Sequence, residues 1–599
     1  MTDSLISIAP AEPLGAPALS RPRVLDSVII TSYLLIAFGL YRDLWLHLGS
    51  GYLVDSSEDQ NLFEWFFAVQ ARALAGGHPT LFSTLQNHPL GVNLMGNTAM
   101  PGLALPLAPV TWAFDPTTTW ALILTGGLAG TATGWYLLFS RHLVRSHWAA
   151  AVGGGCCAFA PPVISHAVAH PNFTAMFLLP VIVGWLLRMT RPERRRRWAR
   201  DGLVLGALVG WQVLIGEEPL LILATGLLVF TMAWAVLRPR TLLASARAAL
   251  PGLGVGALVA LLLVGYPLWV QFFGPASYHA LPHGPAGNDL GSFGALPRQS
   301  LGGKLLHPDQ VVDNPTEQNS FFGWPLLALL AVASVWLWRE FPARLAAITM
   351  VVVLALSVGP HAFLDTHETP IPGPWLFVGQ LPLFNSLIEA RMSFAALPAM
   401  GMLLAMATDR ALADWRGGRA GLLARRLWLA GLAVAVLPIL PVRYTVTPRP
   451  DTPAFFASGA WRQYVRPGHT LVPVPLPVVG SAAALHWQVR AGLGFALPEG
   501  YFVGPSGPGD KQGMYGVPPR PTSRLLADTA RDGTIPPVGP TQRAQAAEDL
   551  RYWQADAVVL PVDEPNAPAL RTVLDRLLGP GEPRDGMLVW PVGSRSLPR

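Results

Sequence analysis

Long apolar segments most constrain what this chain can fold into. Eleven runs of about 17 to 25 mostly apolar residues, the length of a membrane-spanning helix, lie near residues 26–47, 117–140, 148–167, 172–189, 202–217, 219–237, 249–273, 321–338, 345–360, 386–408 and 427–446. Only 13% of the residues are charged, about half of what a soluble protein carries. The sequence therefore predicts an α-helical polytopic membrane protein with about eleven transmembrane helices.

Arginine is concentrated in alternate short loops between these segments. If the N-terminus is cytoplasmic, the inside segments carry 21 arginines, whereas the outside loops carry only Arg72, Arg298 and Lys304. Because positive residues favour the cytoplasmic side, we expect a multi-pass plasma-membrane protein with a cytoplasmic N-terminal tail at residues 1–25. Its long external loops are then 48–116, 274–320 and 361–385. The basic residues are explained by membrane topology, and no nucleic-acid motif accompanies them.

The composition changes after about residue 446, where the predicted transmembrane region 26–446 ends. Residues 447–599 are rich in proline and mixed polar residues. Strand patterns occur in HTLVPVPLP, ADAVVLPVD and GMLVWPV, and helical patterns in AALHWQVRAG and PALRTVLDRLLG. These patterns predict a small α/β domain, and an odd number of spans places it on the extracytoplasmic side.

Asp55, Glu58 and Asp59 stand close together at the start of VDSSEDQNLFEW, just beyond the first apolar run. A carboxylate next to a membrane tends to be solvated, paired or functional, because its transfer into hydrocarbon is costly. A carboxylate within hydrogen-bond reach of an acceptor hydroxyl can act as a general base. Asp59 could also cap a helix over residues 60–74. The alternative is that these acids form only a solvated loop and cap.

Further polar residues stand at the predicted outer ends of spans. His170 and Asn172 in AHPN, and Arg391 in NSLIEARMSF, are candidates for phosphate binding, since a guanidinium donates two parallel hydrogen bonds to phosphate oxygens. For Arg391 the alternative is a pair with Glu389 or a side chain that extends to the membrane interface. For His170 it is a hydrogen-bonded loop histidine, and His166 is a weaker candidate.

Three other residues, Glu218, Glu317 and Asn319, are candidates for lining the same cavity. Glu218 lies in LIGEEPLL between two apolar runs, where a tight outer turn is the alternative to a carboxylate that faces the cavity. Glu317 and Asn319 lie in PTEQNSFFGW, directly before a span.

The ensemble of these segments resembles bacterial members of the GT-C glycosyltransferase superfamily and YfhO-like membrane proteins. The similar stretches are the acidic loop, LFEWFFAVQARALAGGHP, HPLGVNLMGNTAMPGLALPLAPVT, FAPPVISHAVAHPN and QLPLFNSLIEARMSF, which together cover most of residues 26–410. The chain departs from the superfamily pattern where Ser-Pro is replaced by Ala160-Pro161 and Gly-His by Ala169-His170.

The resemblance implies a multi-span bundle with an acidic base in the first external loop and a polyprenyl-phosphate sugar donor. It implies Asp55 and Asp59 as the acidic positions, and since Glu58-Asp59 also fits a paired-acid form, the choice between them stays open. We expect inverting transfer of a hexosyl or pentosyl group to a glycan, lipid or protein acceptor of the cell envelope. No cofactor is certain, because some superfamily members need a divalent metal such as Mg²⁺ or Mn²⁺ and others do not. The alternative is a non-catalytic transporter, flippase or envelope-assembly scaffold, because related architectures host unrelated activities.

Overall fold

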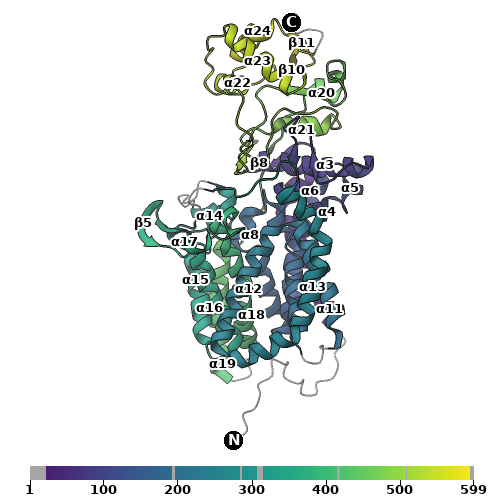
Figure 1. Ribbon diagram of the computed structural model, residues 1–599. Coiled ribbons are helices and arrows are strands. Elements are labelled where there is room, and N and C mark those ends of the chain that lie inside the picture. Colours follow the sequence, from purple (N-terminus) through teal and green to yellow (C-terminus); the bar gives the residue numbers. More distant parts are fainter. Residues whose placement is uncertain are drawn as a thin grey trace.

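The computed structural model describes residues 22–191, 196–283, 287–306, 314–413, 418–507 and 509–593. Residues 1–21, most of the expected cytoplasmic tail, lie outside this part of the chain, as do residues 284–286 and 307–313 of the second expected external loop. A long helical bundle occupies one end of the molecule, and the C-terminal elements α22, α23 and α24 lie at the other end (Figure 1).

Each of the eleven predicted apolar segments contains a helix. These helices are α1 (Pro22–Leu40), α6 (Pro116–His142), α7 (His147–Phe159), α10 (Leu178–Met189), α11 (Trp198–Ile215), α12 (Glu217–Leu237), α13 (Pro239–Phe273), α15 (Trp324–Trp336), α16 (Phe341–Leu356), α18 (Leu397–Ala413) and α19 (Gly418–Val436). Among the described residues, 5 helical stretches are long and apolar enough to cross a membrane: Pro116–His142, Glu217–Leu237, Pro239–Phe273, Glu389–Ala413 and Arg419–Ile439. The polytopic helical architecture is confirmed, whereas the count of eleven spans stays a prediction.

Two predicted spans are interrupted rather than continuous. The stretch 148–167 is divided between α7 and α8 (Pro161–His166), because Pro161 has no N–H to continue the helical hydrogen bonds. The stretch 172–189 is divided between α9 (Pro171–Thr174) and α10. These breaks introduce irregular backbone into the bundle. His166, at the end of α8, and His170, directly before α9, both lie at these breaks.

The first long loop folds into short elements after α2 (Arg42–Leu46). They are β1 (Gly51–Leu53), α3 (Ser57–Gly76), β2 (Phe82–Ser83), β3 (Val92–Asn93), η1 (Met95–Asn97), α4 (Pro101–Ala104) and α5 (Ala108–Ala113). The helix expected over 60–74 begins at Ser57, so Ser56 is its N-cap and Asp59 lies in the first turn. The expected cap by Asp59 was therefore wrong, although its carboxylate still lies near the positive end of the helix dipole.

The second and third long loops lie at the same end of the bundle as the first, which we call the loop end (Figure 1). They contain η3 (Gly291–Gly294), α14 (Leu301–Leu306), η4 (Pro315–Glu317), β4 (His361–Leu364), β5 (His367–Pro372), α17 (Trp375–Val378), η5 (Phe384–Ser386) and η6 (Glu389–Ala396). The carboxylate of Asp289 accepts backbone hydrogen bonds from Asp365 at 3.2 Å and Thr366 at 2.8 Å. These bonds join the second loop to the third.

The C-terminal segment contains a four-stranded sheet in the order β11–β12–β10–β7. Strand β10 (Ala555–Pro561) is parallel to β7 (Thr470–Pro473) and antiparallel to β12 (Met587–Pro591), and β11 (Glu582–Arg584) completes the edge. Side chains of α22 (Pro521–Asp532), α23 (Pro540–Tyr552) and α24 (Ala567–Leu578) form a separate apolar core with this sheet. The three strands predicted from sequence patterns in this segment are present as β7, β10 and β12. The two predicted helices are present as α21 (Ala483–Arg490) and α24.

Residues after the last bundle helix connect the C-terminal sheet to the loop end. They include η8 (Leu437–Ile439), β6 (Val446–Pro448), α20 (Ala454–Ala457), η9 (Ala460–Gln463) and the hairpin of β8 (Val503–Pro505) and β9 (Gly513–Tyr515). Strand β6 is antiparallel to β1. The Nε1 of Trp65 in α3 donates to Oε1 of Gln488 in α21 at 2.5 Å. The C-terminal segment is thus packed directly against the first long loop.

Candidate functional site

An ionic cluster centred on Arg391 lies at the loop end of the bundle. Nη1 of Arg391 donates to both carboxylate oxygens of Glu218, at 2.9 and 2.8 Å. Its Nε donates to Glu317 at 3.2 Å, and its Nη2 donates to the other oxygen of the same carboxylate. The guanidinium also lies 5.1 Å from the ring centroid of Phe173. One cation is therefore shared by two carboxylates, which leaves these three side chains with a net negative charge.

Three separate chain segments deliver these charges. Arg391 lies in η6 just before α18, Glu317 ends η4 just before α15, and Glu218 is the second residue of α12. Gly216 alone separates α11 from α12, so the tight turn expected there is present and Glu218 faces the cluster as well. The sequence suggested Glu389 as a local partner of Arg391. The partners in the structure include Glu218 and Glu317, which lie 173 and 74 residues away in the chain.

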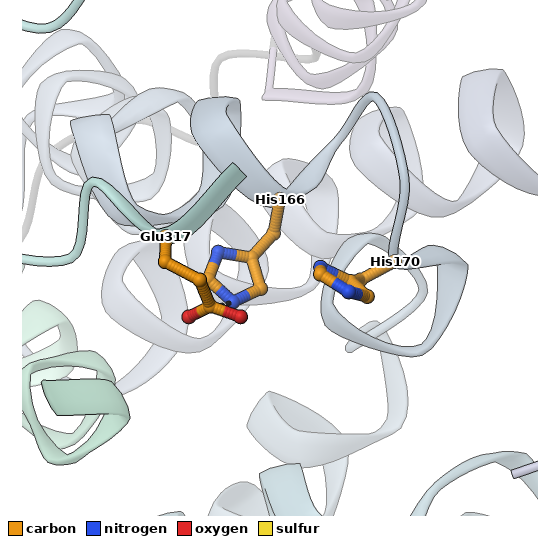
Figure 2. Close-up of side chains that lie close together, drawn as sticks. All are labelled: His166, His170 and Glu317. Carbon is orange, nitrogen blue, oxygen red and sulfur yellow. Dashed lines mark ion pairs between the residues drawn. The ribbon is translucent and has the colours of Figure 1, made fainter. Parts of the chain in front are cut away.

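Two histidines lie beside Glu317, as Figure 2 shows. Nε2 of His166, the last residue of α8, is 3.3 Å from the Glu317 carboxylate. The ring centroids of His166 and His170 are 4.9 Å apart. One potential ligand atom from each of the three residues lies within 4.8 Å of the others.

One imidazole in this group has a nitrogen without a partner. In the described part of the chain, Nδ1 of His170 is buried and makes no hydrogen bond, whereas Nε2 of His166 is buried against the Glu317 carboxylate. Buried polar atoms normally have a partner, so the His170 nitrogen identifies a place that a cation or ordered water would complete. Two imidazoles and one carboxylate are donors that suit Zn²⁺ or Mn²⁺ better than Mg²⁺, which prefers oxygen ligands. The residues present therefore fit a divalent transition-metal ion.

The charges in this group affect its protonation. Burial raises the pKa of Glu317, but Arg391 and His166 outweigh burial and hold that pKa well below its usual range. Burial lowers the pKa of His170 far below its usual value, and the neighbouring His166 and Arg391 lower it further. At neutral pH the site therefore contains an ionised Glu317 and a neutral His170, the forms in which both can bind a metal ion.

Asp59 lies within electrostatic reach of this cluster. Its Oδ1 accepts a hydrogen bond from the hydroxyl of Tyr501 at 2.7 Å. Burial raises the pKa of the Asp59 carboxyl to about 6, and Glu58 and Glu317 add to the rise. The hydrogen bond from Tyr501 and the charge of Arg391 oppose it. Asp59 is thus a carboxylate that is ionised at neutral pH but holds a proton more readily than an exposed aspartate.

The other two candidate acids, Asp55 and Glu58, have different surroundings. Asp55 is exposed, has a positive φ of 62°, and pairs with Arg298 of the second loop at 3.3 Å. Glu58 accepts a hydrogen bond from Ser57 at 2.6 Å. The structure therefore distinguishes three acids that are adjacent in sequence.

The two candidate asparagines also differ. Nδ2 of Asn319 donates to Glu317 at 2.9 Å, and the backbone carbonyl of Asn319 accepts from the Ser393 hydroxyl at 2.6 Å, so Asn319 belongs to the ionic cluster. Asn172 is buried in α9 and packs against Gly216, the turn that precedes Glu218.

Sequence reasoning missed Tyr501 entirely and undervalued His166. Tyr501 lies 442 residues from Asp59, in a segment without a recognisable motif. The spacing of His166 and His170 is a signal that could have identified the pair, because residues four apart are neighbours on a helical turn.

No protein-family model and no curated protein matches the chain. Among solved structures, the arabinofuranosyltransferase AftD from Mycobacteria matches with a TM-score of 0.51 and 15% identity, over 96% of this chain and 40% of that one. The chain has the fold of the GT-C glycosyltransferases. Two other GT-C structures match less well. They are the oligosaccharyltransferase AglB from Archaeoglobus fulgidus, solved with an inhibitory peptide and a dolichol-phosphate (TM-score 0.46, 11% identity, 91% of this chain and 70% of that one), and ArnT from Cupriavidus metallidurans (0.41, 14%, 96% and 99%).

The fold implied by the resemblance to GT-C glycosyltransferases is thus supported, without particular support for YfhO-like proteins. At this level of identity the GT-C fold establishes architecture alone, since one fold can host different reactions.

Proposed function

We propose that the chain is a membrane glycosyltransferase that transfers a hexosyl or pentosyl group from a polyprenyl-phosphate donor to a cell-envelope acceptor. The observation that carries this proposal is the convergence of Asp59 with the cluster of Arg391, Glu218, Glu317 and two histidines at the loop end of a GT-C fold. A carboxylate and a phosphate-binding cation are the groups that this transfer requires in one place.

Asp59 is the proposed general base. Its carboxylate would take the proton of the acceptor hydroxyl as that oxygen forms a bond to the anomeric carbon. The bond between the anomeric carbon and the phosphate oxygen breaks in the same displacement, so the configuration inverts and polyprenyl phosphate leaves. Asp59 suits this role better than Asp55, because a base with a pKa of about 6 is ionised at neutral pH and still accepts a proton readily. Asp55 is instead exposed and paired with Arg298.

Arg391 is the proposed ligand of the leaving phosphate. Its guanidinium holds Glu317, which is 13% exposed, and Glu218, which is 27% exposed. Glu218 is therefore the partner more easily exchanged for a phosphate oxygen, and a guanidinium binds phosphate in the same two-bond geometry as carboxylate. His170 and Asn172 lie on the neighbouring α9 segment and would border the same phosphate.

The negative charge of the cluster supports a metal requirement. A phosphate brought to one guanidinium and two carboxylates would be repelled unless further positive charge is present. We therefore propose that His166, His170 and Glu317 hold a divalent transition-metal ion. When bound, such an ion would supply positive charge to the departing phosphate.

The proposed reaction takes place at the loop end, on the extracytoplasmic side of the plasma membrane. The unequal distribution of arginine supports this orientation. The C-terminal segment is joined to the loop end by Gln488 and strand β6 and would contribute to acceptor binding from that side.

The test is turnover of a panel of radiolabelled polyprenyl-phosphate sugars by the purified full chain in lipid. Each donor is assayed with Mn²⁺, Zn²⁺, Mg²⁺ or a chelator, and release of polyprenyl phosphate is measured. We expect release from one donor and its loss in Asp59→Asn. Absence of both binding and turnover across the panel would overturn the proposal and favour a transporter, flippase or scaffold.

A further inference from the structure

The hairpin of β8 and β9 reaches from the C-terminal segment to the candidate site. Strand β8 is fixed to the first loop by a pair of bonds, in which Asn97 Nδ2 donates to the Val503 carbonyl at 2.8 Å and the Val503 N–H donates to Asn97 Oδ1 at 2.6 Å. Strand β9 is fixed to the second loop, because the Gly513 N–H donates to the Ala280 carbonyl at 2.7 Å. The hairpin is therefore anchored on two loops of the bundle.

This anchoring fixes Tyr501, which lies two residues before Val503. Its hydroxyl donates to Asp59 Oδ1 at 2.7 Å. A hydrogen bond to an ionised oxygen is shorter and stronger than one between neutral groups. Since the bond engages Oδ1, Oδ2 is the oxygen that can accept a proton from a substrate.

We propose that Tyr501 is a positioning residue, supplied by the C-terminal segment, that holds the Asp59 carboxylate in place and stabilises its ionised form. This inference rests on the proposed function, in which Asp59 is the base. It gives the C-terminal segment a part in the chemistry besides contact with an acceptor.

The charges that face Asp59 explain why such a residue is needed. Glu58 from the same helix and Glu317 from the second loop both disfavour a negative charge on Asp59. Arg391 favours it but is already shared by two carboxylates. The Tyr501 hydroxyl is the largest single influence that lowers the pKa of Asp59 against burial.

The test compares Tyr501→Phe with the wild-type chain in lipid by carbodiimide labelling of Asp59 across a pH series, read out by mass spectrometry. A carbodiimide reacts with the protonated carboxyl, so the midpoint of labelling reports proton binding at Asp59 without any substrate. We expect the midpoint to rise by about one pH unit, a tenfold increase in proton affinity. Tyr552→Phe is the matched control, because Tyr552 lies in α23 against Arg520 and should leave the midpoint unchanged. An unchanged midpoint in Tyr501→Phe would overturn the inference.

A second measurement keeps the wild-type packing. Fluorotyrosine is placed at position 501, and its ¹⁹F resonance is followed with pH in the otherwise native chain and with Asp59→Asn. We expect a titration with a midpoint near the Asp59 pKa of about 6, which disappears in Asp59→Asn. A resonance that is independent of pH and unaffected by Asp59→Asn would contradict the contact.

Activity measurements separate this inference from the proposed function. With an active donor, kcat of Tyr501→Phe should fall most near pH 6 and recover above the raised pKa, a recovery that a folding defect would not produce. If labelling of Asp59 shifts but no donor is turned over, the glycosyltransferase proposal fails while the contact stands. If transfer occurs and Tyr501→Phe has the wild-type pH profile, the positioning role is wrong and the enzyme proposal survives.

Discussion

Arg449 and Glu64 form an ion pair of 2.8 Å in which the two side chains are only 1% and 2% exposed. Arg449 follows β6 and Glu64 lies in α3, so the pair joins the C-terminal segment to the first long loop. Nε2 of Gln60 donates to the same glutamate at 2.9 Å, and the Arg449 guanidinium lies 4.3 Å from the ring of Tyr52. This fully buried charge pair is thus a second connection between the C-terminal segment and the first long loop, besides the contact of Tyr501 with Asp59.

Loss of one partner of this pair should strongly destabilise the protein. Glu64→Gln leaves the Arg449 charge buried without compensation, a change that typically costs about 3–5 kcal/mol of unfolding free energy. Chemical unfolding in a mild detergent measures the effect. The control is Asp528→Asn, which removes an exposed pair with Arg531, both side chains being more than half exposed. Similar destabilisation by both variants would contradict this account.

Asp59→Asn and Asp55→Asn should differ in activity although the two acids are four residues apart. Loss of a general base lowers kcat by about 10²–10⁴, so we expect that loss in Asp59→Asn. Asp55→Asn breaks only a partly exposed pair with Arg298 and should retain most of the activity. The release of polyprenyl phosphate is the measurement, with expression and thermal unfolding as controls. Full activity of Asp59→Asn would remove it as the base.

The pH dependence of transfer should have an acidic limb near pH 6. Burial raises the pKa of Asp59 to about 6, so below this value the base is protonated and kcat/KM falls about tenfold per pH unit. Because the pKa is raised from 3.8 on folding, the associated stability is present at low pH and is lost as pH rises through about 6. A limb near pH 4 instead would indicate an exposed carboxylate as the base.

Metal binding should depend on the two histidines. His166→Ala and His170→Ala should each weaken binding of Mn²⁺ or Zn²⁺ by at least about 10-fold, because even residues that only orient ligands contribute 10–100-fold. Calorimetric titration and elemental analysis of the purified chain measure this. His367→Ala, an exposed histidine of β5, is the control. Retention of wild-type affinity by both site variants would place any metal elsewhere.

Arg391→Lys should impair transfer although the positive charge is kept. A lysine ammonium cannot make the two-sided contact with Glu218 and Glu317, because it lacks the planar fork of the guanidinium. We expect a clear fall in kcat. The free energy of unfolding should also fall, because contacts with the two glutamates are lost. Arg410→Lys at the opposite end of α18 is the matched control. Equal activity of the two variants would mean that bidentate geometry is unimportant here.

Membrane architecture could be read from the chain because it depends on local composition. A helix that crosses a bilayer satisfies its own backbone hydrogen bonds and needs an apolar surface, so each span is marked within about 20 consecutive residues. The strands and helices of the C-terminal segment were recognised for the same reason. Apolar residues recur every 2 residues in a strand and about every 3.6 residues in a helix, and either pattern is visible within a short stretch of sequence. The first-loop acids, His170, Arg391 and Glu317 were also identifiable, because polar groups stand out against apolar neighbours.

The partners of those polar groups could not be read from the chain. Arg391 meets Glu218 and Glu317, and Asp59 meets Tyr501, across separations of 173, 74 and 442 residues. Ion pairs and hydrogen bonds act over a few ångströms in space and leave no periodic trace in sequence. Apolar periodicity along the chain therefore determined the bundle and the loop end, whereas three-dimensional packing alone determined which carboxylate faces the cluster and which remains on the surface.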